Sequence, residues 1–267
     1  LSPFKSVIQA DKKLKKTVKP EAEIRPAKRN IEEFSIIFYI LGFITAVCMG
    51  LTKTFWFDAT QIEVYALHSL FISLIVLYCL KIMTALNEPV KKNWIILFIL
   101  LGFSLSNHLS TVFIIPGLIY LMFLQHKSNR LFTKKILPLV LLVIPGLLMY
   151  SVLVIASGTG PFLNWSDLQN VSNLFDHLRG ADYSQLMFSS TSKFGKNASD
   201  FFINLPGEMA IIPLIFSVAG LVLLLKIFKS LFAFIIITIL FNLLYAFNYN
   251  IVDINTYYLL VFLLLGL

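Results

Sequence analysis

Long apolar runs separated by short basic turns constrain the fold of this chain more than any other feature of its sequence. The runs are expected to be helical at residues 34–51, 64–83, 94–125, 136–156, 209–225 and 231–247. An α-helix rises about 1.5 Å per residue, so about 20 apolar residues are enough to cross a bilayer. The sequence therefore predicts an all-α, polytopic transmembrane bundle with about seven or eight apolar helices.

The composition agrees with a membrane protein and excludes a nucleic-acid-binding domain. Hydrophobic residues make up 58% of the chain and charged residues only 13%, whereas a soluble domain is about 25% charged. The net charge of +8 is explained by positive loops on one side of a membrane, so no nucleic-acid partner is expected. Cys48 and Cys79 both lie in apolar runs, and their spacing indicates neither a metal site nor a disulfide framework.

One apolar run, residues 94–125, has a polar centre. It is too long for one ordinary span and too short for two full ones, at about 20 residues each. The polar residues that interrupt it are Ser104, Ser106, Asn107, His108, Ser110 and Thr111. Backbone that leaves the helix at membrane depth is tolerated only where protein or water surrounds it. We therefore expect two short helices that meet at a polar turn, a broken hairpin.

The distribution of lysine and arginine predicts the domain organisation and the orientation. Residues 1–33 are expected to be a basic cytoplasmic linker, with an amphipathic helix on anionic lipid as the alternative. Residues 34–267 are expected to be a transmembrane domain with an outward loop at 157–208, truncated at both ends. Most basic residues fall in the tail and the turns at 81–92, 126–135 and 226–229, which the positive-inside rule places in the cytoplasm. The polar stretches at 52–63, 106–111, 157–208 and 248–258 then share the other side.

The stretch 52–68 carries ionisable groups at the mouth of an apolar segment. Asp58, Glu63 and His68 are costly to desolvate there, which makes them functional candidates. Glu63 is expected on a helical stripe with Ala59, Leu67 and Leu70. The alternatives are a helix N-cap for Asp58, a hydrogen bond to tyrosine or tryptophan for Glu63, and plain packing for His68.

Four further polar residues are candidates for substrate contact. Asn107 and His108 lie at the helix break, where they either contact a sugar hydroxyl or phosphate or satisfy freed backbone groups. Arg179, in the long loop, has the planar charged fork that suits a phosphate, with a surface salt bridge as the alternative. Asp253 is a carboxylate beside interfacial tyrosines, which by themselves are common membrane anchors.

Taken together, several short motifs resemble one known family. They are Phe55-Trp56 with Glu63-Val64-Tyr65, then Gly102 with Ser106-Asn107-His108-Leu109, and then Asp253-Ile254-Asn255-Thr256-Tyr257-Tyr258. The set is similar to a bacterial membrane family long described as a domain of unknown function. That family is related to the vertebrate endoplasmic-reticulum O-mannosyltransferase of plexin-type receptors, in the GT-C superfamily of glycosyltransferases.

The resemblance implies a GT-C-like membrane glycosyltransferase. It would move a sugar, with mannose expected, from a polyprenyl-phosphate donor to a hydroxyl on a protein or glycan acceptor at the periplasmic or lumenal face, in a bacterial inner membrane. The family's acidic motif is absent from this sequence. The principal base is therefore expected upstream, with Glu63 and Asp58 in supporting roles, and a divalent cation is left open. The substrate-binding residues that we expect are Asn107, His108, Trp56, Tyr65, His68, Arg179, Asp253, Asn255 and Tyr257.

Other classes of membrane protein fit the same residues. Intramembrane Glu63 and His68 and a broken hairpin suit a transporter or a lipid flippase equally well. A non-catalytic membrane scaffold subunit is a third interpretation. A pathway that reaches both faces of the membrane would favour transport, whereas a site closed toward the cytoplasm would favour group transfer.

Overall fold

The structure, a computed structural model, describes residues 24–86, 91–162, 164, 167–188 and 190–267. The chain divides into two compact units, Leu1–Val47 and Cys48–Leu267. Most of the predicted basic linker, residues 1–23, lies outside the described residues. Helix α2, which begins at Ile24 and ends at Gly50, already includes the last part of that linker.

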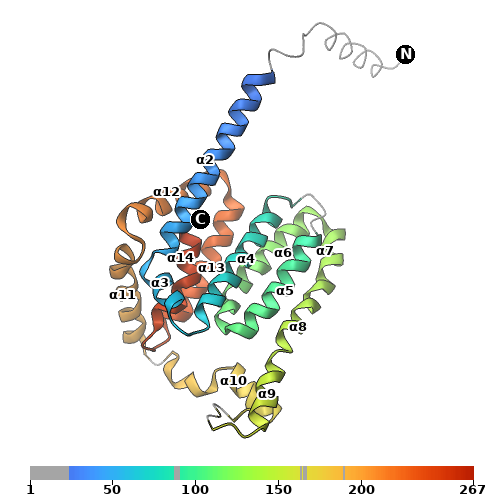
Figure 1. The fold of residues 1–267 in the computed structure, drawn as a ribbon, viewed down its shortest axis with the longest axis vertical. Helices are drawn as coiled ribbons and strands as arrows, with labels where there is room; N and C mark the ends of the chain where they lie inside the picture. Colours follow the sequence, from blue (N-terminus) through green and yellow to red (C-terminus); the bar gives the residue numbers. More distant parts are fainter. Residues whose placement is uncertain (1–23, 87–90, 163, 165–166, 189) are drawn as a thin grey trace, which may run out of the picture. The chain divides into compact units, whose positions relative to one another are not determined.

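The second unit is built from helices throughout its described residues (Figure 1). In chain order they are α3 (Lys53–Thr60), α4 (Tyr65–Met83), α5 (Lys91–Asn107), η1 (Leu109–Ile114), α6 (Ile115–Ser128), α7 (Arg130–Ile136), η2 (Leu137–Val143), α8 (Ile144–Leu147), α9 (Tyr150–Gly158), α10 (Val171–Leu178), η4 (Ala181–Leu186), α11 (Thr191–Met209), α12 (Ile211–Ile227), α13 (Lys229–Phe247), η5 (Ile254–Tyr258) and α14 (Leu259–Leu265). The η elements are short 3₁₀ helices.

Four helical segments in the described part of the chain are long and apolar enough to cross a membrane. They are Tyr65–Met83, Leu109–Ser128, Arg130–Gly158 and Lys229–Phe247, and two further bent helix pairs would raise the number to six. No β-strand forms among the described residues, where the only ladder-type contact is a single antiparallel bridge between Met187 and Tyr249. The prediction of an all-α transmembrane bundle is confirmed.

The predicted broken hairpin is also confirmed. The side-chain oxygens of Ser104 and Thr111 are 2.6 Å apart, whereas seven residues of continuous helix would separate their backbones by about 10 Å. At the other end, Nε2 of Gln125 donates a hydrogen bond to the carbonyl of Leu86 at 3.0 Å. The end of α6 therefore lies beside the end of α4, and the chain runs in one direction in α5 and in the opposite direction in α6.

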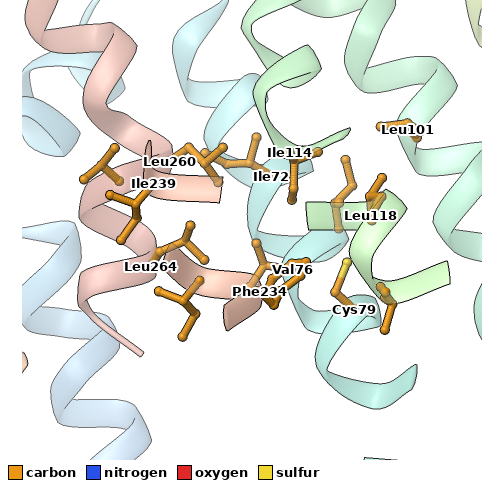
Figure 2. Close-up of a cluster of buried hydrophobic side chains, with 14 of the residues drawn as sticks. Ile72, Val76, Cys79, Leu101, Ile114, Leu118, Phe234, Ile239, Leu260 and Leu264 are labelled. Carbon is orange, nitrogen blue, oxygen red and sulfur yellow. The ribbon is translucent and has the colours of Figure 1, made fainter. Parts of the chain in front are cut away.

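A buried apolar cluster holds α4, α5, α6, α13 and α14 together (Figure 2). Its labelled members in the figure are Ile72, Val76, Cys79, Leu101, Ile114, Leu118, Phe234, Ile239, Leu260 and Leu264. In a bilayer such contacts stabilise mainly through close packing, since lipid is as apolar as the side chains themselves. The short α14 lies inside this cluster, with Leu259 and Leu264 each 1% exposed.

Glycines allow the closest helix contacts in the bundle. A methyl group added at Gly146 would overlap the backbone of Gly102 and Phe103, and one added at Gly102 would overlap the carbonyl of Val143. The span that begins at Arg130 therefore packs directly against the α5 backbone. Small residues serve this purpose in many membrane helix pairs.

The structure corrects two expectations about local structure. The segment 157–208 is not simply a polar loop, because it contains α10 and most of α11. Pro206 lies inside α11, and the chain turns by 110° from α11 into α12 at Ala210, whose φ is 60°. Glu63 is not on a helical stripe with Leu67 and Leu70, because α3 ends at Thr60 and α4 begins only at Tyr65.

Candidate functional site

One end of the bundle gathers polar side chains from segments far apart in the sequence. The beginning of α4, the end of α5, the beginning of η1, the end of α13 and the beginning of η5 all meet there. We call the group formed by Tyr65, His68, His108, Ser110, Asp253 and Tyr257 the histidine–tyrosine cluster. The lysines at the ends of α4 and α6 and at the beginnings of α5 and α13 lie toward the opposite end.

A chain of hydroxyl groups and imidazoles runs through the cluster. Oγ of Ser110 lies 2.6 Å from Nδ1 of His108 and 2.9 Å from Nε2 of His68. Oγ1 of Thr111 lies 3.5 Å from Nδ1 of His68 and 2.6 Å from Oγ of Ser104. The two histidines are therefore joined by one serine hydroxyl, and the Ser104–Thr111 pair extends the chain into the core.

His108 also shapes the backbone at the helix break. It has extended backbone angles at the N-terminus of η1, and its Nδ1 accepts a hydrogen bond from the Ser110 amide at 3.3 Å. This is the ordinary geometry of a helix N-cap, filled here by an imidazole. Burial lowers the pKa of His108 to about 4, an effect that the nearby Asp253 opposes. The imidazole is therefore neutral at pH 7.

Aromatic rings surround His108. The ring centroids of Tyr65, His68 and Tyr257 lie 5.2, 5.0 and 5.7 Å from that of His108. The Tyr65 hydroxyl donates a hydrogen bond to Oδ2 of Asp253 at 3.1 Å. Tyr257 in turn contacts Tyr245 and Tyr249. The result is a surface of aromatic faces with an exposed carboxylate beside it.

Asp58 is the most unusual carboxylate in the described part of the chain. It is 1% exposed, and neither of its carboxylate oxygens has a hydrogen-bond partner among the described residues. Asp253 and Glu208 are close enough to act on it electrostatically. Glu208 itself accepts a hydrogen bond from the amide of Thr54, at 2.7 Å. A buried carboxylate without a partner is costly, so this position is a candidate for function.

Backbone pairing fixes the two segments beside the cluster. The amide of Phe188 donates to the carbonyl of Asn248, and the amide of Asn250 donates to the carbonyl of Leu186. Nδ2 of Asn197 donates to the carbonyls of Phe247 and Tyr249. The segment after η4 and the helix α11 are thereby attached to the end of α13, close to the aromatic rings.

The structure brings together some of the residues singled out from the sequence. Tyr65, His68, His108, Asp253 and Tyr257 are in the cluster. Asn107 is adjacent, and its Nδ2 donates to the carbonyl of Val64 at 3.2 Å. That bond joins the helix break to the beginning of α4.

Other candidates lie apart from the cluster contacts. Trp56 is 58% exposed, and Glu63 and Asn255 are exposed as well. Arg179 forms an ion pair with Asp176 at 2.6 Å, one turn away on the surface of α10, where its side chain is 60% exposed. Sequence reasoning did not single out Ser110 or Glu208. The density of polar residues at 104–111 was the available signal for Ser110.

A metal ion is not assigned to the described residues. Among them, no three His, Cys, Asp or Glu side chains converge in a way that could hold one. Asp253 and Glu208 act on Asp58 through charge, and the three do not form a ligand set.

Membrane-length helices with a polar cluster at one end define a polytopic helical membrane protein. Residues 7–131 match the family model described as the N-terminal domain of the protein O-mannosyl-transferase TMEM260. The chain is thus related to the vertebrate O-mannosyltransferase, and the match points to a protein O-mannosyltransferase-like glycosyltransferase family. The matched segment includes Tyr65, His68, His108 and Ser110, whereas Asp253 and Tyr257 lie beyond it. No curated protein and no solved structure matches the chain.

Proposed function

We propose that this chain is the membrane domain of a glycosyltransferase that moves a sugar, with mannose expected, from a polyprenyl-phosphate carrier to a hydroxyl acceptor. One observation carries the proposal. The family match over residues 7–131 includes four of the six residues of the histidine–tyrosine cluster. The other two come from η5 and the segment before it, which pack against the matched four.

The reaction requires groups that this end of the bundle contains. The acceptor oxygen attacks the anomeric carbon of the sugar, the bond from that carbon to the phosphate oxygen breaks, and the phosphate keeps the bonding electrons. A general base takes the acceptor proton when it is within hydrogen-bond reach. Asp58, Glu63, Glu208 and Asp253 are carboxylates near the cluster.

Charge predicts which side of the membrane the cluster faces. The helix ends that hold Lys81, Lys127 and Lys229 lie at the opposite end of the bundle from the cluster. The positive-inside rule assigns such turns to the cytoplasm. The cluster then faces the periplasm of a bacterial inner membrane, or the equivalent lumenal side, where a lipid-linked donor would present its sugar.

A reconstituted transfer assay tests this function. The whole protein in liposomes would be supplied with polyprenyl-phosphate mannose and a serine- and threonine-rich acceptor peptide, and mannosylated peptide would be measured. We expect transfer by the wild type and a loss of at least tenfold for His108→Gln and Asp253→Asn. Arg179→Gln is the control, because that side chain is exposed and paired locally, and it should retain full activity.

Two outcomes would overturn the proposal. One is no transfer with any lipid-linked hexose by a folded wild-type protein. The other is movement of the lipid carrier between leaflets without transfer to the peptide, which would identify a flippase. Full activity of both His108→Gln and Asp253→Asn would support the transfer reaction but show that the histidine–tyrosine cluster takes no part in it.

A further inference from the structure

The hydrogen bonds around His108 determine which of its ring nitrogens carries the proton. The backbone amide of Ser110 lies 3.3 Å from Nδ1 of His108, and an amide N–H can only donate. Nδ1 must therefore be the acceptor. In a neutral imidazole the other nitrogen is then protonated, so His108 carries its hydrogen on Nε2.

The direction of each other hydrogen bond in the hydroxyl–imidazole chain follows from this assignment of Nδ1 as an acceptor. With Nδ1 of His108 accepting, the Ser110 hydroxyl donates to it at 2.6 Å and is free to accept from Nε2–H of His68 at 2.9 Å. Nδ1 of His68 is then the acceptor that faces the Thr111 hydroxyl. All the bonds run in one direction, from Ser104 in the core toward His108 at the end of the bundle. The chain therefore ends in one outward donor, the Nε2–H of His108.

That donor is available to a ligand. Nε2 of His108 makes no hydrogen bond within the described residues, and it is not among their buried unpartnered atoms. The rings of Tyr65 and Tyr257 flank the imidazole, and Asp253 is held beside it by the Tyr65 hydroxyl. A donor and a carboxylate acceptor beside aromatic faces suit a hydroxyl-bearing sugar ring, because each hydroxyl both donates and accepts.

The charges at this position disfavour a phosphate. The groups that act electrostatically on Tyr65 and Asp58 include Asp253, Glu63 and Glu208, and Asp253 also acts on His108. All of them are carboxylates. An anion brought among them would be repelled, whereas a neutral sugar would not.

We propose that Ser110 and His68 are positioning residues that fix His108 as an Nε2–H donor, and that this donor and Asp253 together bind a hydroxyl of a neutral sugar. This inference rests on the proposed function for the identity of the ligand. It assigns the cluster to the sugar of the donor substrate and places the phosphate of the lipid carrier elsewhere. It also predicts that the tautomer of His108 is determined by Ser110.

Histidine-selective ¹⁵N NMR tests the positioning role independently of any enzyme assay. The chain has only four histidines, so the His108 ring is assigned by its loss in His108→Gln. At pH 7 we expect the Nε2–H tautomer of His108 in the wild type, in Ser110→Thr and in Ser110→Ala, because all three keep the backbone amide that donates to Nδ1. The Nδ1 resonance should shift only in Ser110→Ala, which loses the hydroxyl bond of 2.6 Å. Ser106→Ala is the matched control, because its hydroxyl bonds only the carbonyl of Phe103. A protonated Nδ1 in the wild type, or an Nδ1 resonance in folded Ser110→Ala that equals that of the wild type, overturns the inference.

A second measurement tests the ligand. The labelled protein in lipid nanodiscs would receive undecaprenyl phosphate alone or undecaprenyl-phosphate mannose. We expect the Nε2 resonance of His108 to shift only with the mannose-bearing lipid, while His126, near the opposite end of the bundle, does not move. An equal shift with both lipids, or no shift with either, overturns the sugar assignment. A mannose-dependent shift without transfer activity would support this inference and count against the proposed function.

Discussion

The hydroxyl of Tyr65 donates a hydrogen bond to Oδ2 of Asp253 at 3.1 Å, across 188 positions of sequence. This bond joins the first turn of α4 to the segment before η5. It holds an exposed carboxylate beside the imidazole of His108, which lies against the Tyr65 ring. Two parts of Tyr65 therefore contribute to the geometry of the histidine–tyrosine cluster. Its ring contacts His108, and its hydroxyl binds Asp253.

Replacement of Tyr65 by phenylalanine should separate these two tasks. The ring remains and the bond to Asp253 is lost, so we expect a change in thermal stability no larger than about 1 kcal/mol, the usual net worth of one hydrogen bond. Sugar transfer should fall about tenfold because Asp253 is no longer held in place. Transfer rates and melting temperatures of the purified protein provide the measurement. An unchanged rate in Tyr65→Phe would mean that the position of Asp253 does not matter.

The helices were predictable because apolar length is a strong and local signal. The span at Tyr65–Met83 and the break at His108 follow from runs of apolar residues and from the polar residues that interrupt them. The same pattern of apolar runs and polar interruptions also predicts that alternate helix ends lie together at one end of the bundle, because each short turn reverses the direction of the chain. These features require no knowledge of which side chains touch.

The contacts within the site were not predictable in the same way. Glu63 appeared to belong to a helix, but the break between Thr60 and Tyr65 leaves it exposed. Arg179 is neutralised by Asp176 one turn away, a pairing that its spacing allowed but did not require. The bond from Thr54 to Glu208 spans 154 positions, and no local pattern in a single sequence encodes such a contact.

Alanine at Gly146 should destabilise the bundle strongly. Its methyl group would overlap the backbone of α5 at Gly102 and Phe103, which cannot move as a flexible side chain could. We expect a loss of about 1–3 kcal/mol, the usual cost of overpacking. Thermal unfolding in detergent, followed by tryptophan fluorescence, gives the measurement.

Gly220→Ala is the matched control for this substitution. Gly220 lies within α12, and nothing is within 4 Å of the added methyl group. Alanine is the better helix former by about 1 kcal/mol, so the melting temperature should stay the same or rise. If Gly146→Ala behaved in the same way as Gly220→Ala, the close contact between α5 and α8 would not exist in solution.

Acid should destabilise the fold in part through His108. Its pKa is lowered by burial to about 4 in the folded protein, against about 6.5 when exposed. Between these values the unfolded chain binds a proton that the folded protein does not, so stability falls as the pH drops from about 6.5 to about 4. Melting temperatures across this window should fall less in His108→Gln than in the wild type. Parallel curves for the two proteins would show that His108 does not contribute.

Cysteine labelling should show the two ends of the bundle on opposite sides of the membrane. Lys127 and Asn255 are both exposed, the first near the end of α6 and the second in η5. The native Cys48 is exposed and would be replaced by serine, whereas Cys79 is buried and can remain. In intact cells an impermeant maleimide should modify Asn255→Cys at once, and Lys127→Cys only after the membrane is permeabilised. The positive-inside rule gives this direction.

The pattern of labelling separates two claims about the topology. Modification of both cysteines from the same side would contradict the hairpin of α5 and α6, and the histidine–tyrosine cluster could then not lie opposite the basic turns. Modification of Lys127→Cys alone in intact cells would preserve the hairpin and invert the protein. In that case the cluster would face the cytoplasm, where the proposed lipid-linked donor does not present its sugar.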